Sequence, residues 1–127
     1  MRYVLLFLLL PGLAFAQAPT PTHRCDYDGL WTCLIVGGCG EPAAGDAFIL
    51  LDLVGSEVGM CLSENSCTWT PATVTYLPEF VFVTYGTHQH WNLQSTHIRL
   101  STDLTEFLTM AFGRTSIGGG HGHCSEV

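Results

Sequence analysis

Residues 58–77 read VGMCLSENSCTWTPATVTYL, and this stretch decides the fold class. Two apolar and β-branched runs, 58–62 and 67–77, flank a polar turn that is bracketed by Cys61 and Cys67. Val, Thr, Trp and Tyr favour strands, and a polar turn between two such runs is typical of a β-hairpin. The stretch therefore predicts two antiparallel strands clipped by a disulfide, with Pro71 at a bulge or a sheet edge.

Five further runs of the same character occur at 29–36, 47–54, 80–85, 96–100 and 105–112, each bounded by turn residues. The run at 80–85, FVFVTY, has the highest aromatic and β-branched content. About 7–8 short strands at hairpin spacing predict an all-β fold, a small antiparallel barrel or sandwich stapled by disulfides. The capping-box pattern at 103–106 also allows a helix, but threonines and aromatics favour a strand there.

The N-terminus has the pattern of a secretion signal. Arg2 precedes the apolar run VLLFLLL at 4–10, and Ala14 and Ala16 supply the small residues of a cleavage site. The apolar run is shorter than the about 20 residues of a membrane-spanning helix. We therefore expect a signal peptide at 1–16, a Pro- and Thr-rich tether at 17–24 and one β domain at 25–127. This domain has no membrane span and lies in the periplasm or outside the cell.

All six cysteines lie downstream of the predicted signal, at Cys25, Cys33, Cys39, Cys61, Cys67 and Cys124. An even number of cysteines in an oxidising compartment predicts three disulfides. Equal five-residue gaps favour Cys61 with Cys67 and Cys33 with Cys39, which leaves Cys25 and Cys124 to join the ends of the domain. An equally serious alternative pairs Cys25 with Cys39 and Cys33 with Cys124. No Cys-x-x-Cys motif is present, which argues against a thioredoxin-type redox pair and a zinc ribbon.

The exported chain is strongly acidic. Without Arg2 its only cations are Arg24, Arg99 and Arg114, against 11 acidic residues, a formal charge of −8. Such a charge repels the phosphate backbone, so nucleic acid and anionic lipid are not expected partners. The charge permits a cationic ligand or a basic protein without indicating either, so the partner stays unknown, with a protein or a small ligand as the classes that the sequence allows.

Two His-x-His pairs are the one chemical motif of the chain: His88 with His90, and His121 with His123. Side chains at i and i+2 of an extended chain point to the same face, and neutral imidazole binds copper and zinc. A Cu or Zn site at these four histidines, with His97 as a further ligand, is therefore one hypothesis. The simpler interpretation is two solvated loops, the second of them rich in glycine, and no cofactor at all.

Other chemistry is weakly indicated. The sequence has no serine-nucleophile elbow, zinc-protease motif or phosphate-binding glycine loop. Carboxylates are scattered among predicted loops, at Asp26, Asp28, Asp52, Glu57 and Glu79. Trp31, Trp69 and Trp91 could line a ligand cavity, although core or barrel-end packing is the commoner role of tryptophan. The leading hypothesis is therefore a non-enzymatic binding or structural module, followed by a Cu/Zn-binding protein and by a small secreted enzyme inhibitor.

Two resemblances accompany these patterns. Gly29-Leu30-Trp31 resembles the Gly-x-Trp that opens lipocalin and avidin-type barrels. The whole layout is a signal, clustered cysteines at Cys25, Cys33 and Cys39, β-hairpins, and a Gly-His-Cys ending at Cys124. This layout resembles small uncharacterised exported cysteine-rich β proteins of alphaproteobacteria. The resemblance implies a periplasmic setting and brings no catalytic residues.

Overall fold

The computed structural model describes residues 18–42, 45–88 and 93–127, so the predicted signal peptide lies outside it. Within these ranges no helix is long and apolar enough to span a membrane. The described strands are β1 (His23–Leu34), β2 (Gly38–Gly40), β3 (Phe48–Asp52), β4 (Glu57–Ser63), β5 (Ser66–Tyr76), β6 (Val81–His88), β7 (Leu93–Leu100), β8 (Glu106–Gly113) and β9 (Ser116–Glu126).

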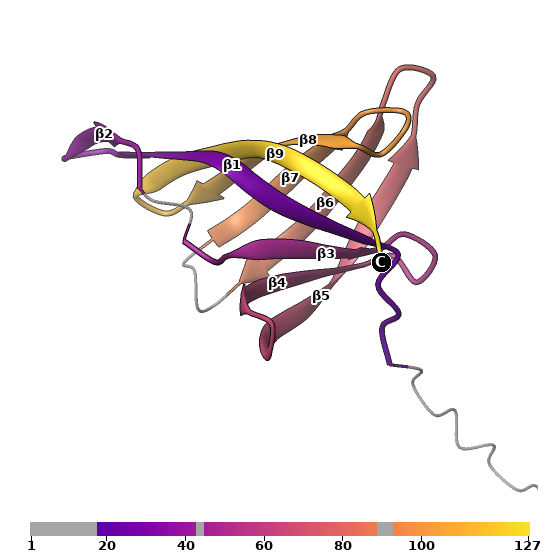
Figure 1. The fold of residues 1–127 in the computed structure, drawn as a ribbon. Helices are drawn as coiled ribbons and strands as arrows, with labels where there is room; N and C mark the ends of the chain where they lie inside the picture. Colours follow the sequence, from indigo (N-terminus) through magenta and orange to yellow (C-terminus); the bar gives the residue numbers. More distant parts are fainter. Residues whose placement is uncertain (1–17, 43–44, 89–92) are drawn as a thin grey trace, which may run out of the picture.

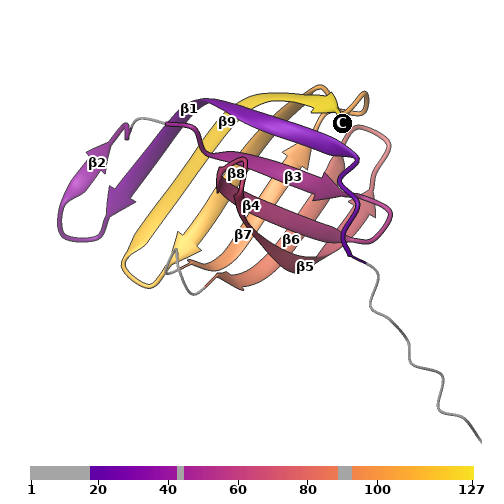
Figure 2. The same cartoon turned by 60° about the horizontal axis from the view of Figure 1, so that its bottom comes forward.

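Eight of these strands form a closed antiparallel barrel (Figures 1 and 2). Each strand from β3 to β9 pairs with the next, and β1 closes the barrel because it pairs with both β3 and β9. The short β2 pairs with the last three residues of β1 and projects from the barrel. The all-β prediction is confirmed, and of its two architectures the chain adopts the barrel. The strand predicted at 105–112 is also confirmed, as β8.

The strand β9 corrects the expectation of a glycine-rich loop near the C-terminus. Its inner face carries Gly118, Gly120 and Gly122. A Cβ on Gly120 would lie 2.6 Å from Cδ2 of Leu30, and a Cβ on Gly122 would lie 2.8 Å from Cε1 of Phe107. The space beside β9 is thus filled by side chains of β1 and β8. Glycine weakens a strand in general, but here it admits the large residues of the neighbouring strands.

The barrel interior is a packed apolar core. Alternate residues of the strands point inward, and Ile49, Leu51, Val58, Val83, Ile98 and Leu100 are at most 1% exposed. The rings of Tyr27 and Phe107 meet edge to face across β9, with centroids 5.1 Å apart. Full burial of one such aliphatic side chain contributes roughly 1.5–3 kcal/mol, so this core is the main source of stability.

Each of the three disulfides joins residues that lie directly opposite each other on neighbouring strands. Cys25–Cys124 links β1 to β9, Cys33–Cys39 links β1 to β2, and Cys61–Cys67 links β4 to β5. This is the first of the two pairings considered from the sequence. Three disulfides indicate an oxidising, extracytoplasmic compartment.

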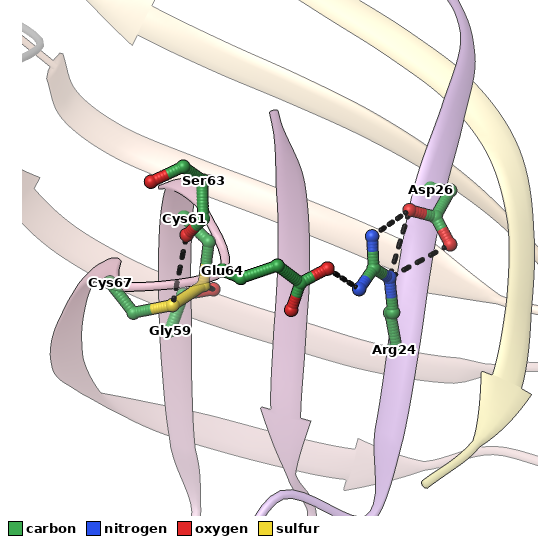
Figure 3. A network of polar contacts seen from close by, with 7 residues as sticks. All are labelled: Arg24, Asp26, Gly59, Cys61, Ser63, Glu64 and Cys67. Carbon is green, nitrogen blue, oxygen red and sulfur yellow. Dashed lines mark hydrogen bonds and ion pairs between the residues drawn. A yellow bond between two sulfur atoms is a disulfide. The ribbon is translucent and has the colours of Figure 1, made fainter. Parts of the chain in front are cut away.

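Arg24 fastens the outside of β1 to the turn between β4 and β5 (Figure 3). Its guanidinium pairs with Asp26 at 3.0 Å and with Glu64 from that turn. It also lies 3.9 Å over the ring centroid of Phe48, which is 3% exposed although its neighbour Ile49 points into the core. The arginine thus shields an outward-facing aromatic ring from water.

Removing Cys25–Cys124 should destabilise the domain more than removing Cys33–Cys39. The first bridge spans 99 residues and the second spans six. In the chain-entropy model a loop of about 100 residues contributes about 4.7 kcal/mol, and a very short loop contributes about half of that. Urea unfolding of the double variants C25A/C124A and C33A/C39A measures this difference. Equal losses of unfolding free energy would contradict the prediction.

Gly122→Ala should destabilise the barrel strongly. A Cβ there would lie 2.0 Å from the carbonyl oxygen of Asp26, so β1 and β9 would have to separate. Overpacking of this kind costs about 1–3 kcal/mol or more. The matched control is Gly86→Ala in β6, where a Cβ meets nothing within 4 Å. We expect a large drop in Tm for the first variant and little change for the second; similar melting curves would disprove the packing role of Gly122.

Candidate functional site

The four histidines of the predicted metal site differ in what surrounds them. His121 and His123 are exposed on the outer side of β9, and their i, i+2 spacing brings them to one face as expected. His123 Nδ1 contacts the carboxylate of Asp28, which sits at a bulge of β1. The ring of His121 lies against Gly29. His88 ends β6, and His90 lies outside the described residues.

A metal site is not assembled in the described part of the chain. There, no group of three His, Cys, Asp or Glu side chains is placed to hold an ion. All six cysteines are in disulfides. His97, the further ligand considered from the sequence, is on β7 between the rings of Phe82 and Phe112. The Cu/Zn hypothesis stays a prediction, because His90 lies outside the described residues.

The outer side of β6, β7 and β8 carries an apolar surface that the sequence analysis did not predict. On β8 the outward residues Leu108, Met110 and Phe112 are 46%, 38% and 37% exposed. The inward residues of the same stretch, Thr109 and Ala111, are smaller. A half-buried strand normally turns its more apolar side to the core, so this arrangement is unusual.

We call this surface the β6–β8 face and define it by six residues. They line an open hollow of about 370 Å³: Phe82, His97, Arg99, Leu108, Met110 and Phe112. The hollow is built from neighbouring strands, because Arg99 lies between Phe82 and Leu108 in the sheet register.

His97 stands at the centre of an aromatic row on the β6–β8 face. Its ring stacks on Phe82 with centroids 5.7 Å apart and meets Phe112 edge to face at 5.8 Å. Its Nδ1 atom is buried and has no hydrogen-bond partner among the described residues. A buried polar atom without a partner costs about 1–3 kcal/mol, so the two aromatic rings hold His97 in place despite that cost.

Arg99 gives the β6–β8 face its charge. The guanidinium lies 4.7 Å over the ring centroid of Phe80, and no described carboxylate is within ion-pair distance of it. Arg24, by contrast, holds two carboxylates. In a chain with 11 acidic residues and four basic ones, an arginine without a carboxylate on an apolar surface is suited to an external anion.

Trp31 and Trp69 each cover a glycine of a neighbouring strand. Trp31 lies over Gly119 on the neighbouring strand, and Trp69 lies over Gly59 in the same way. An aromatic ring that covers a strand glycine replaces the packing that the glycine lacks. Both residues therefore stabilise the outside of the barrel, and Trp91 lies outside the described residues.

Two tyrosines of the barrel have raised pKa values because they are removed from water. Burial raises the pKa of Tyr27 to about 12, and it raises the pKa of Tyr85 as well. The hydroxyl of Tyr85 donates to Sδ of Met60 at 3.3 Å. Both phenols therefore stay protonated at neutral pH.

The carboxylates named in the sequence analysis have structural surroundings. Asp26 binds Arg24 and Asp28 binds His123, while Glu57 is half-buried and Glu79 is exposed. Asp52 is the buried one, 6% exposed at the end of β3. Its carboxylate accepts hydrogen bonds from the amide of Gly55 at 2.6 Å and from that of Thr20 at 3.0 Å. It thus closes the β3–β4 turn and fixes the segment before β1.

Asp52→Asn should lower the free energy of unfolding at neutral pH. In acid, the difference between the variant and the wild-type protein should become smaller. The amides of Gly55 and Thr20 hold the pKa of Asp52 below its ordinary value of 3.8. A carboxyl with a lowered folded-state pKa stabilises above the unfolded value and loses that contribution as pH falls through the folded pKa. Two amides donate to this carboxylate, and replacing a charged acceptor by a neutral one costs about 1 kcal/mol for each bond, so we expect a loss on the order of 2 kcal/mol at pH 7. Urea unfolding of both proteins at pH 7 and at about pH 3 tests this; a gap that persists undiminished in acid would contradict it.

Comparisons with known proteins found no similar protein. No protein-family model matches it, and neither a curated protein nor a solved structure does. Its function must therefore be argued from its own residues.

Proposed function

We propose that this chain is an exported, non-enzymatic binding module that takes a small anionic amphiphile on the β6–β8 face. The observation that carries the proposal is Arg99, a cation that lies at the edge of an apolar hollow and has no carboxylate partner within residues 18–42, 45–88 and 93–127. The three disulfides support export, as does the predicted signal peptide at 1–16.

The size and lining of the hollow indicate what apolar group the ligand would carry. A volume of about 370 Å³ is in the range of small-molecule sites, which run from about 300 to 1,000 Å³. Phe82, Leu108 and Met110 offer an apolar floor on which a hydrocarbon or aromatic body can lie. Covering these side chains removes apolar surface from water, which is the main driving force for binding.

Arg99 indicates that the head group of the ligand would be an anion. A guanidinium donates paired hydrogen bonds that match a carboxylate, sulfonate or phosphate group. The net charge of −7 for the whole chain disfavours anions at long range, so discrimination has to come from the contact itself. The head group therefore belongs beside Arg99 and the apolar body on β8.

The test uses anilinonaphthalene sulfonate, an aromatic anion whose fluorescence rises in an apolar site. Titration of the folded, exported protein should show saturable binding that Arg99→Gln weakens by about 10-fold or more, because a charge-assisted hydrogen bond is lost. Met110→Ser should weaken it as well. The matched control is Arg114→Gln, an exposed arginine in the turn between β8 and β9, which should leave the affinity unchanged.

Competition then tests the head group. Dodecanoate below its micelle concentration should displace the fluorophore, and dodecyltrimethylammonium, with the same tail and the opposite charge, should not. Equal displacement by both, or equal losses in the Arg99 and Arg114 variants, would reject the proposed role of Arg99. Absence of saturable binding by the wild-type protein would reject the function.

A further inference from the structure

The hairpin between β1 and β2 ends in an apolar tip formed by Leu34, Ile35 and Val36. These side chains are 52%, 77% and 98% exposed. The sequence around them, CLIVGGCG at 33–40, contains no charged or hydrogen-bonding side chain other than the two cysteines of the disulfide. Three consecutive exposed aliphatic residues are avoided on ordinary soluble surfaces and mark a contact site.

The tip is held in one shape before it meets a partner. Cys33–Cys39 closes the hairpin directly behind it, and the amide of Gly37 donates to the carbonyl of Leu34 at 3.3 Å. The amide of Ile35 donates to the carbonyl of Thr115 at 3.0 Å, which ties the tip to the turn between β8 and β9. A preformed contact site loses little conformational entropy on binding.

The tip also lies where it can reach a surface before the rest of the molecule does. The β1–β2 hairpin projects from one end of the barrel, away from the C-terminus (Figures 1 and 2). The adjoining turn carries Arg114, an exposed cation next to Thr115. At a membrane surface, the apolar tip would contact the hydrocarbon of the lipid chains, and Arg114 would contact the phosphates of the headgroups.

We propose that this tip enters the interface of a zwitterionic lipid bilayer and holds the exported domain reversibly at the membrane surface. A lipid interface requires only apolarity of what enters it, whereas a protein pocket also uses well-placed polar groups for specificity, and the tip offers none. The net negative charge of the protein repels anionic lipid, so we expect no preference for anionic membranes. Three aliphatic side chains present less hydrocarbon than a single myristoyl chain, so binding is weak and readily reversed.

The experiment is flotation of the exported protein with phosphatidylcholine vesicles. Its N-terminus is checked by mass spectrometry, so that the apolar run at 4–10 cannot itself bind lipid. Wild-type protein should float with the vesicles, and Val36→Asp should lower the partition coefficient by about 10-fold, because a carboxylate replaces an inserted side chain. Ile35→Asp should act in the same direction.

The matched control is Val54→Asp. Val54 is 89% exposed and lies in the turn between β3 and β4, at the other end of the barrel. This variant has the same charge as Val36→Asp and should float like the wild type, while circular dichroism confirms that all variants are folded. An equal loss in both variants would overturn the proposal, because it would show a charge effect. Failure of the wild-type protein to float would overturn it as well and would point to a protein pocket for the tip.

A second arm varies the lipid. Replacing part of the phosphatidylcholine with phosphatidylglycerol should weaken partition, since the protein is acidic. Stronger partition into the anionic vesicles would overturn the zwitterionic preference. The outcome is separate from that of the β6–β8 face, because Val36→Asp changes the tip alone and leaves the residues of that face in place.

Discussion

The pairing of β1 with β9 is the interaction on which the rest of the structure depends. It joins the first strand to the last from Leu34 with Ser116 to His23 with Glu126, with one bulge of β1 at Asp28, and it leaves the eight-stranded sheet without an open edge. An open edge would expose a row of unpaired amides and carbonyls to other chains. Cys25–Cys124 lies within this pairing, and the glycines of β9 let the two strands approach while the interior stays filled.

The same closure explains why the proposed binding surface lies outside the barrel. Thr109 and Ala111 of β8 face Gly120 and Gly118 of β9, in a part of the interior that Leu30 and Tyr27 already occupy. Larger inward residues on β8 would find no space there. Beyond the inward Phe107, the large apolar residues of β8 are therefore on the outer positions, where they form the β6–β8 face with Arg99 and His97. A filled core and an apolar exterior are two results of one packing arrangement.

Much of the fold could be predicted from the sequence, because its signals are local. Strand propensity and turn residues indicated seven of the strands, and the five-residue cysteine gaps indicated the two hairpin disulfides. The strand β9 could not be recognised, because SIGGGHG has low strand propensity and its partners, β1 and β8, determine its conformation.

The candidate site was harder to predict, since it depends on which side of a strand faces inward. In EFLTMAFG both sets of alternating residues contain large apolar side chains, so the pattern alone does not identify the exposed set. In the structure, Phe107 and Thr109 face inward and lie opposite glycines of β9. The histidine pairs form a sequence motif, whereas Arg99 belongs to no motif that indicates a site.

The hairpin carrying β2 is attached to the barrel through β1 and through the hydrogen bond from the amide of Ile35 to the carbonyl of Thr115. Its only strand partner in the described structure is β1, over three residue pairs beyond the stretch where β1 meets β3. Length and composition of this hairpin can therefore change without shifting the register of any barrel strand. The fold thus separates a closed eight-stranded frame from one appendage that a disulfide closes. For the same reason, the position suits the grafting of foreign peptides.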